Sequence, residues 1–168
     1  METEAFILHA NDWLPNNERL PVLLYRGVIK AEGKAAAERF ERLFADHGWP
    51  PQWRDTIFDY DHYHSTAHEA LGVAAGHGTL LLGGPGGREV EVQAGDALVL
   101  PVGVGHRRLA VSDDFRVVGA YPDGQDWDIR RDAPSDEIRR RMRALPVPQS
   151  DPVAGEAGPL VETWRRPD

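Results

Sequence analysis

Short apolar runs separated by glycine and proline dominate the middle of the chain. Runs suited to strands occupy residues 6–8, 22–28, 57–64, 69–75, 79–82, 89–93, 97–100, 107–111 and 115–121. The 17 Gly and 13 Pro fall largely between them, which is the punctuation of an all-β fold. Seven short strands within residues 57–121 predict a compact antiparallel barrel or sandwich.

Two stretches have helical periodicity instead. Residues 34–47 place Phe40 and Phe44 on one stripe, and Gly48 followed by two prolines ends that helix. Ser135 is a suitable N-cap for a second helix ending near residue 144. The four arginines of that helix, at 139–141 and 143, lie toward its C-terminal end, where cations complement the helix dipole. We therefore interpret them as helix-stabilising charges and not as a nucleic-acid surface.

The remaining segments fit one domain over residues 1–168. We expect a core barrel over about 57–121, preceded by strands and a helix over 1–50. A C-terminal helix and a Pro-rich tail follow over 122–168, and the tail is expected to dock through Leu160, Val161 and Trp164. The five tryptophans are interpreted as core or tail-docking residues, because no basic residues interleave them. The glycine-rich segment 83–87 is expected to be a hairpin loop, since no phosphate-loop lysine follows it.

Composition excludes several classes of protein. The chain has no Cys, which rules out disulfide scaffolds, cysteine-ligated zinc fingers and thiol catalysis. Its formal charge of -8 argues against a nucleic-acid partner. No stretch approaches the ~20 apolar residues of a membrane span, and no signal peptide is visible, so a cytoplasmic protein is expected.

Histidines gather in one short segment. His62 and His64 are two residues apart, so on a strand they project from the same face. Glu69 follows after a short bend, and imidazole with carboxylate suits borderline transition metals. His106 follows an apolar strand that ends in a Pro and Gly bend, which makes it the best candidate for a fourth ligand. The alternative is a solvated or hydrogen-bonded histidine face without metal.

Two motifs carry a family resemblance. The pattern His62-x-His64-x4-Glu69-x6-Gly76 resembles the first cupin motif, and Gly95-x5-Pro101-x-Gly103-x2-His106 resembles the second. The wider pattern is similar to the uncharacterised bacterial YjlB-like cupins. The resemblance implies a small antiparallel barrel, or jelly roll, with a divalent metal held by His62, His64, Glu69 and His106. The ion would be Fe, Mn, Ni, Co, Cu or Zn, and cupins of this kind commonly form homodimers, here through the strands before Trp49.

Two motif positions depart from the family pattern. Thr56 stands where the first motif usually opens with Gly, and Ala110 stands where the second usually ends with Asn. Neither position is a metal ligand, so the departures concern loop geometry. His68 is left out of the ligand set because it should face away from Glu69, although it replaces His62 if the bend is shifted.

Residues around the metal are predicted by strand parity. Tyr60 shares the parity of His62 and His64, so it is the candidate catalytic phenol, with a core tyrosine as the alternative. Arg108 and Tyr121 are further candidates for the mouth of the barrel.

The sequence favours metal-dependent chemistry on a small polar molecule, of dioxygenase or isomerase and lyase type. The alternative is a sensor or storage cupin that binds a small molecule or metal without turnover, and a purely structural role comes third.

Overall fold

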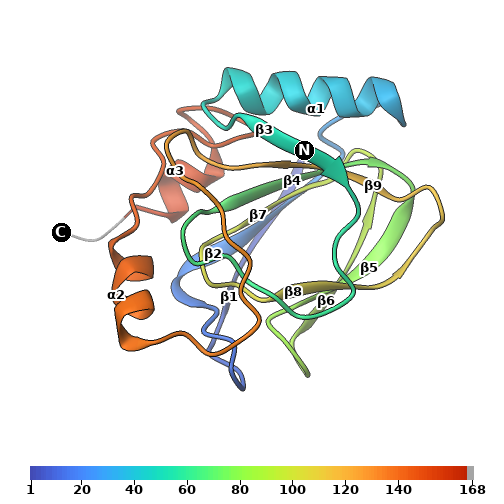
Figure 1. Cartoon of the computed structure of the whole chain (residues 1–168). Helices are drawn as coiled ribbons and strands as arrows, with labels where there is room; N and C mark the ends of the chain where they lie inside the picture. Colours follow the sequence, from blue (N-terminus) through green and yellow to red (C-terminus); the bar gives the residue numbers. More distant parts are fainter. Residues whose placement is uncertain (166–168) are drawn as a thin grey trace.

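Two antiparallel sheets form the body of the molecule (Figure 1). The structure is a computed structural model that describes residues 1–165. Its elements, in chain order, are β1 (Glu2–Leu8), β2 (Asn17–Arg26), α1 (Lys34–Asp46), β3 (Pro51–Asp55), β4 (Glu69–Ala75), β5 (His77–Leu82), β6 (Arg88–Gln93), β7 (Ala97–Leu100), β8 (His106–Val111), β9 (Arg116–Ala120), α2 (Asp136–Ala144) and α3 (Pro159–Thr163). One sheet has the order β1-β2-β7-β4-β9-β3 and the other β6-β5-β8. The expected antiparallel, mainly β fold of jelly-roll type is confirmed.

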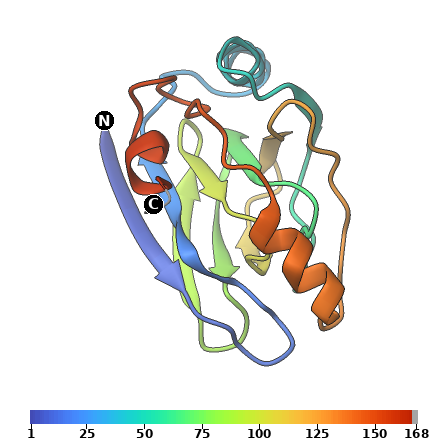
Figure 2. The ribbon, with the colours of Figure 1, turned by 90° about the vertical axis from the view of Figure 1, so that its left-hand side faces the viewer.

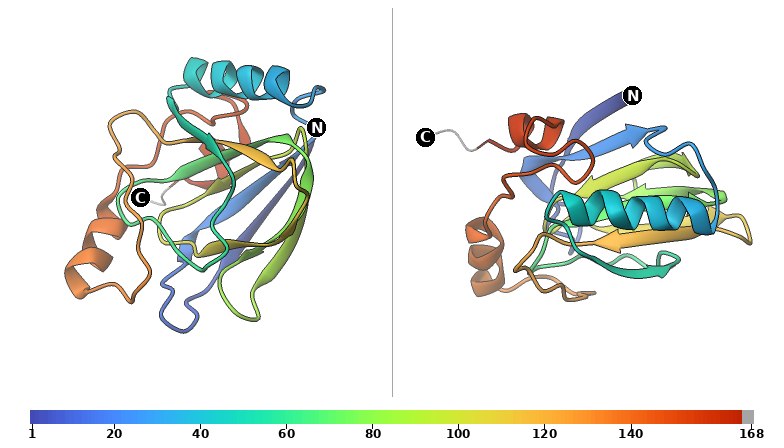
Figure 3. Two further views of the ribbon diagram at one scale, coloured as in Figure 1. Left: turned by 45° about the vertical axis from the view of Figure 1, so that its right-hand side comes forward. Right: turned by 90° about the horizontal axis from the view of Figure 1, so that it is seen from above.

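The inner strands of the six-stranded sheet, β2, β7, β4 and β9, are buried on both faces because other side chains pack against each face. In β2, Val22 and Leu24 point to the core between the two sheets, whereas Leu23 and Tyr25 point to the opposite side. There α1 and α3 cover the outer face and contribute Phe40, among others, to a second core. Figure 2 shows α3 beside β2, and Figure 3 shows α1 lying over the sheet, roughly along the strands beneath it in the right-hand view. Such two-sided burial explains why these strands read as continuous apolar runs.

Asp151 fastens the C-terminal tail to the barrel. Its carboxylate is fully buried and accepts a hydrogen bond from the Tyr25 hydroxyl at 2.6 Å. It also accepts from the backbone N–H groups of Val153, Ala154 and Leu160, at 2.7, 3.0 and 3.0 Å. Trp164 is buried and donates to the carbonyl of Pro21. Docking of the tail through Leu160 and Trp164 is therefore confirmed, whereas Val161 is only half-buried. The helix α3 was not expected from the sequence.

The expected strand over residues 57–64 is wrong. The segment makes only isolated bridges, His62 with His106 and Tyr63 with Arg130, so it is extended but belongs to neither sheet. The strand that pairs with β9 is β3, which begins at Pro51. A proline is tolerated there because β3 is an edge strand and Pro51 is its first residue.

The second predicted helix is confirmed. The Ser135 hydroxyl accepts a hydrogen bond from the N–H of Ile138 at the start of α2, and Arg141 and Arg143 lie in its last turn. Within residues 1–165, none of the helices has the length and apolarity needed to cross a bilayer.

Gly95 is expected to be among the least replaceable turn residues. Its φ is +101°, and a Cβ there would lie 2.4 Å from the carbonyl oxygen of Ile29. Gly86 has a φ of +76° but no atom within 4 Å of such a Cβ. Gly86→Ala should therefore cost about 1 kcal/mol, from backbone strain alone, and Gly95→Ala about 3 kcal/mol or more. Urea unfolding of both variants measures the difference, and equal losses would contradict the steric argument.

Candidate metal centre

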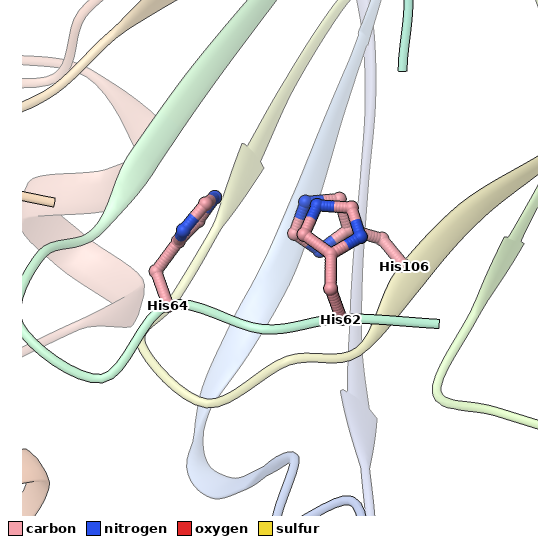
Figure 4. A group of neighbouring side chains, drawn as sticks. All are labelled: His62, His64 and His106. Atoms are coloured by element: carbon pink, nitrogen blue, oxygen red, sulfur yellow. The ribbon is translucent and has the colours of Figure 1, made fainter. Parts of the chain in front are cut away.

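Three buried histidines converge at one end of the barrel (Figure 4). His62 and His64 come from the extended segment after β3, and His106 is the first residue of β8. The backbones of His62 and His106 are joined, with the N–H of His106 donating to the His62 carbonyl at 2.9 Å. One ring nitrogen of each histidine lies within 4.8 Å of the corresponding atoms of the other two. The backbone pairing of His62 with His106, and not the expected strand, therefore aligns these two rings.

Each imidazole is held by the same kind of contact. The Nδ1 atoms of His62 and His106 lie 3.1 and 3.0 Å from the carbonyl oxygens of Tyr60 and Val104, and Nδ1 of His64 contacts the carbonyl of Asp128. Because a carbonyl oxygen can only accept, each Nδ1 is assigned the hydrogen. That tautomer leaves Nε2 with a lone pair, as a metal ligand requires.

Glu69 lies against two of the three histidines, His64 and His106. It is the first residue of β4 and 2% exposed. Its Oε2 accepts from the Tyr121 hydroxyl at 2.6 Å and lies 3.0 Å from His64 Nε2. Its Oε1 lies 3.2 Å from His106 Nε2 but has no hydrogen-bond partner among residues 1–165. A buried carboxylate oxygen without a partner is costly, and a cation would satisfy it. The donor set therefore fits a divalent transition metal.

The charges of the site depend on one another. Burial raises the pKa of Glu69, but the neighbouring His64 and His106 outweigh it and hold that pKa well below its usual range. Burial lowers the pKa of His64, yet the Glu69 carboxylate outweighs this and the net pKa is raised. Burial, with the nearby His106, lowers the pKa of His62 to about 3. A metal would therefore displace a proton from His64 and compete best above the pKa of that imidazole.

A polar strap, which we define as residues 122–134, runs beside the extended segment (Figure 1). Besides the carbonyl that holds His64, Asp128 offers its carboxylate to the backbone N–H of Ser65 at 2.6 Å and to Arg130 Nε at 3.1 Å. Burial raises the pKa of Asp128, but the hydrogen bonds from Ser65 outweigh it and lower the pKa. Asp128 was not predictable from the sequence, because it holds His64 through a backbone oxygen that no side-chain pattern reveals.

The histidines open into a cavity of about 230 Å³. Its lining comprises Trp53, Asp55, Thr56, Ile57, Phe58, His62, His64, Glu69, Leu71, His106, Tyr121, Trp127 and Ile129. Tyr121 lies where the parity argument expected it, but Arg108 does not line this cavity. Trp127, expected in the core or under the tail, is 41% exposed and forms part of the wall.

Tyr60 does not reach the cavity, so its expected inward position needs correction. Its ring stacks on Phe58 at 4.8 Å between centroids, and the guanidinium of Arg131 lies 3.8 Å from its centre. Parity failed because the segment is not a regular strand, so residues two apart need not share a face. Its carbonyl, and not its phenol, serves the site by accepting from His62.

His68 lies apart from the three histidines. Its Nδ1 accepts from the N–H of Val102 at 3.0 Å, and its ring packs 4.8 Å from that of Trp164. It therefore faces the tail side of the sheet, as its omission from the ligand set supposed.

Comparisons with known proteins place the chain in a family. No family model matches it. It is 34% identical over 165 residues to the uncharacterized protein YjlB of Bacillus subtilis (strain 168), and the match covers 97% of both chains. Acireductone dioxygenase from Bacillus anthracis, solved with cadmium in its active centre, is 18% identical with a TM-score of 0.40, over 56% of this chain and 64% of that one, less than two thirds of the enzyme. A cupin 2 domain-containing protein from Halorhodospira halophila is 10% identical with a TM-score of 0.33, over 85% and 76% of the two chains. At the identity and coverage of the YjlB match, the chain belongs to the YjlB family.

Proposed function

We propose that this protein is a metal-dependent enzyme that acts on a small molecule at the His62, His64, Glu69 and His106 group. The proposal rests mainly on the three histidines, each of which contacts a backbone carbonyl through its Nδ1 and so leaves its Nε2 free to bind a metal. It is supported by Oε1 of Glu69, which has no hydrogen-bond partner in the described chain. A divalent ion held there would supply Lewis-acid polarisation of a carbonyl or enediolate or, as iron, activation of dioxygen.

Tyr121 is the residue we assign to proton and carboxylate positioning, in place of Tyr60. Its hydroxyl donates to Glu69 Oε2 and accepts from Trp53 Nε1 at 2.9 Å. Burial and the Glu69 carboxylate raise its pKa, so the phenol stays protonated at neutral pH. It therefore holds one oxygen of Glu69 and leaves the other oxygen directed to the histidines.

The experiment begins with elemental analysis of the full chain purified without an affinity tag or chelator. The protein is then stripped and reloaded separately with Fe, Mn, Co, Ni, Cu or Zn, and offered diketones, sugars, thiols and aromatic diols. Metal-restored oxygen uptake or product formation supports the enzyme. Ligand binding that raises the melting temperature without product, under every metal, would instead establish the binding or storage alternative.

Tyr121→Phe is expected to weaken metal binding about 10-fold, within the 10–100-fold range typical of residues that position a ligand. The loss follows because Glu69 Oε2 no longer receives its short hydrogen bond. Chelator competition with the reloaded protein measures the affinity. Tyr60→Phe is the matched control and should bind metal as the unaltered chain does. Equal affinity in the Tyr121 variant would remove the positioning role.

The expected homodimer is proposed to form through β1. This strand is the outer member of the six-stranded sheet, so within the described chain only β2 pairs with it. Ile7 in the same strand is 36% exposed. Light scattering after gel filtration is expected to give the dimer mass, and Ile7→Lys should shift it toward the monomer. A monomeric unaltered chain at high protein concentration would contradict the proposal.

A further inference from the structure

Large apolar side chains are exposed at the mouth of the cavity. In residues 1–165, six large hydrophobic residues are exposed, and three of them line this one cavity: Phe58 at 42%, Trp127 at 41% and Ile129 at 41%. They come from both sides of the opening, Phe58 from the extended segment and the other two from the polar strap. Contiguous apolar surface around a concave site is typical of a surface that a ligand covers.

Apart from Asp55 and Thr56, which are exposed, the polar side chains of the lining lie at the inner end of the cavity. Beyond the histidines and Glu69, the inner wall is made of Ile57, Leu71, Trp53 and Tyr121. The polar atoms of the last two are already engaged, since Trp53 donates to the Tyr121 hydroxyl and that hydroxyl donates to Glu69. A ligand with many hydroxyl groups would therefore leave most of them without partners, which is costly in a buried site.

The charges around the cavity also favour a ligand without an anionic group. Among residues 1–165, no Lys or Arg belongs to the lining, whereas Asp55 adds a carboxylate at the exposed edge. Arg130 is paired with Asp128, and Arg131 lies on the Tyr60 ring. Arg108, whose backbone N–H donates to the Phe58 carbonyl, also lies outside the lining, although its Nε has no hydrogen-bond partner in the described chain. An anionic group on the ligand, away from the metal, would thus find no counter-ion in the cavity wall itself.

The walls suit a flat ring of limited size. Trp127 and Tyr121 stack at 5.5 Å with 15° between their planes, and both meet the His64 ring edge-on. A dry cavity of about 150 Å³ is large enough for benzene, so about 230 Å³ has room for one substituted six-membered ring.

Resting on the metal-dependent function above, we propose that the substrate is an uncharged, planar, largely apolar molecule about the size of one substituted six-membered ring. Its oxygen donors lie at one end and face the histidines, while the ring contacts Trp127, Phe58 and Ile129. This narrows the small polar molecule expected from sequence to one whose polar atoms are gathered on one side.

The test uses the full chain loaded with zinc, which is redox-inert and does not consume the probe. Calorimetry compares catechol with 3,4-dihydroxybenzoate, which adds a carboxylate, cis-1,2-cyclohexanediol, which removes planarity, and gluconate. Catechol is expected to bind at least about 10-fold more tightly than each of the others. Zinc content is measured before and after each titration, so that removal of metal by catechol is recognised.

Substitutions in the cavity wall test whether catechol binds there. Trp127→Ala should weaken catechol binding about 10-fold, as loss of a stacking partner does, and Trp127→Phe should restore most of it. Ile129→Arg should shift the preference toward the carboxylate. Leu109→Ala is the matched control, because Leu109 is a similarly exposed apolar residue (37%) outside the cavity lining. Tighter binding of gluconate or the carboxylate by the unaltered chain, or no effect of Trp127→Ala, would overturn the proposal.

A separate experiment distinguishes failure of the metal site from failure of the proposed substrate class. Metal-free protein is titrated with benzyl alcohol and benzoate, neither of which needs a metal, by ligand-observed NMR. Binding of benzyl alcohol that depends on Trp127 supports the ring-sized apolar cavity even if no zinc is taken up, in which case only the metal-dependent function fails. Preference for benzoate would contradict the substrate class whatever the metal content.

Discussion

Replacing His106 with Ala is expected to weaken metal binding by more than about 100-fold, beyond the range caused by loss of an outer-sphere partner. The physical reason is the loss of one of three converging Nε2 donors, whose position is fixed by the Val104 carbonyl. Elemental analysis after desalting measures the stoichiometry, and chelator competition measures the affinity.

A stability readout checks that the variant is folded and unliganded. Metal at 100 times its dissociation constant stabilises the native state by about 2.7 kcal/mol, which raises the melting temperature of a chain this size by about 5 to 10 °C. The unaltered chain should show this shift and His106→Ala should not. His77→Ala is the control, since His77 is exposed on β5 and outside the group. Stoichiometric metal in the His106 variant would show that the three histidines are not a metal site.

The second large effect is expected at Asp151. Asp151→Ala removes the acceptor of four hydrogen bonds and leaves the Tyr25 hydroxyl and the Leu160 N–H buried without partners. We expect a loss of about 3 to 4 kcal/mol of unfolding free energy, because unpaired buried donors keep their full desolvation cost. Urea unfolding followed by circular dichroism measures it.

Two further variants test whether the loss of stability comes from the Asp151 carboxylate. Glu156→Ala, at an exposed acidic residue in the same tail, should change stability by no more than about 0.5 kcal/mol. Tyr25→Phe removes a single bond to the carboxylate and should cost less than Asp151→Ala. If all three variants unfold alike, the carboxylate does not fasten the tail.

Those parts of the fold that depend on local pattern could be predicted from the sequence. The apolar stripe ending at Gly48 and the N-cap at Ser135 each mark a helix by short-range chemistry, and the structure has both. Strands β4 to β9 were likewise marked by apolar runs between turn glycines. The segment 57–64 was misjudged because its apolar residues line a cavity and are not paired within a sheet, a difference that only long-range contacts create.

In the candidate site, too, local sequence pattern predicts some residues, whereas others are brought in only by long-range contacts. Spacing placed His62, His64, Glu69 and His106 in candidate positions, and the fold brings them together. Tyr121 lies 52 residues from Glu69, and Asp128 lies 64 residues from His64, the side chains that they respectively hold. Asp128 does so through a main-chain oxygen. Side-chain identity carries no information about such a contact, so the strap's role emerges only from the folded chain.

The polar strap both orients a histidine and forms part of the cavity wall, and these two roles limit how its sequence can change during evolution. Asp128 fixes the orientation of His64, and its neighbours Trp127 and Ile129 form the outer wall of the cavity. Insertions or deletions that reshape the wall would also shift the carbonyl that sets the tautomer of His64, a proposed metal ligand. Selectivity for a new ligand is therefore reached more readily through Phe58 or Leu71, whose side chains can be exchanged without moving that carbonyl.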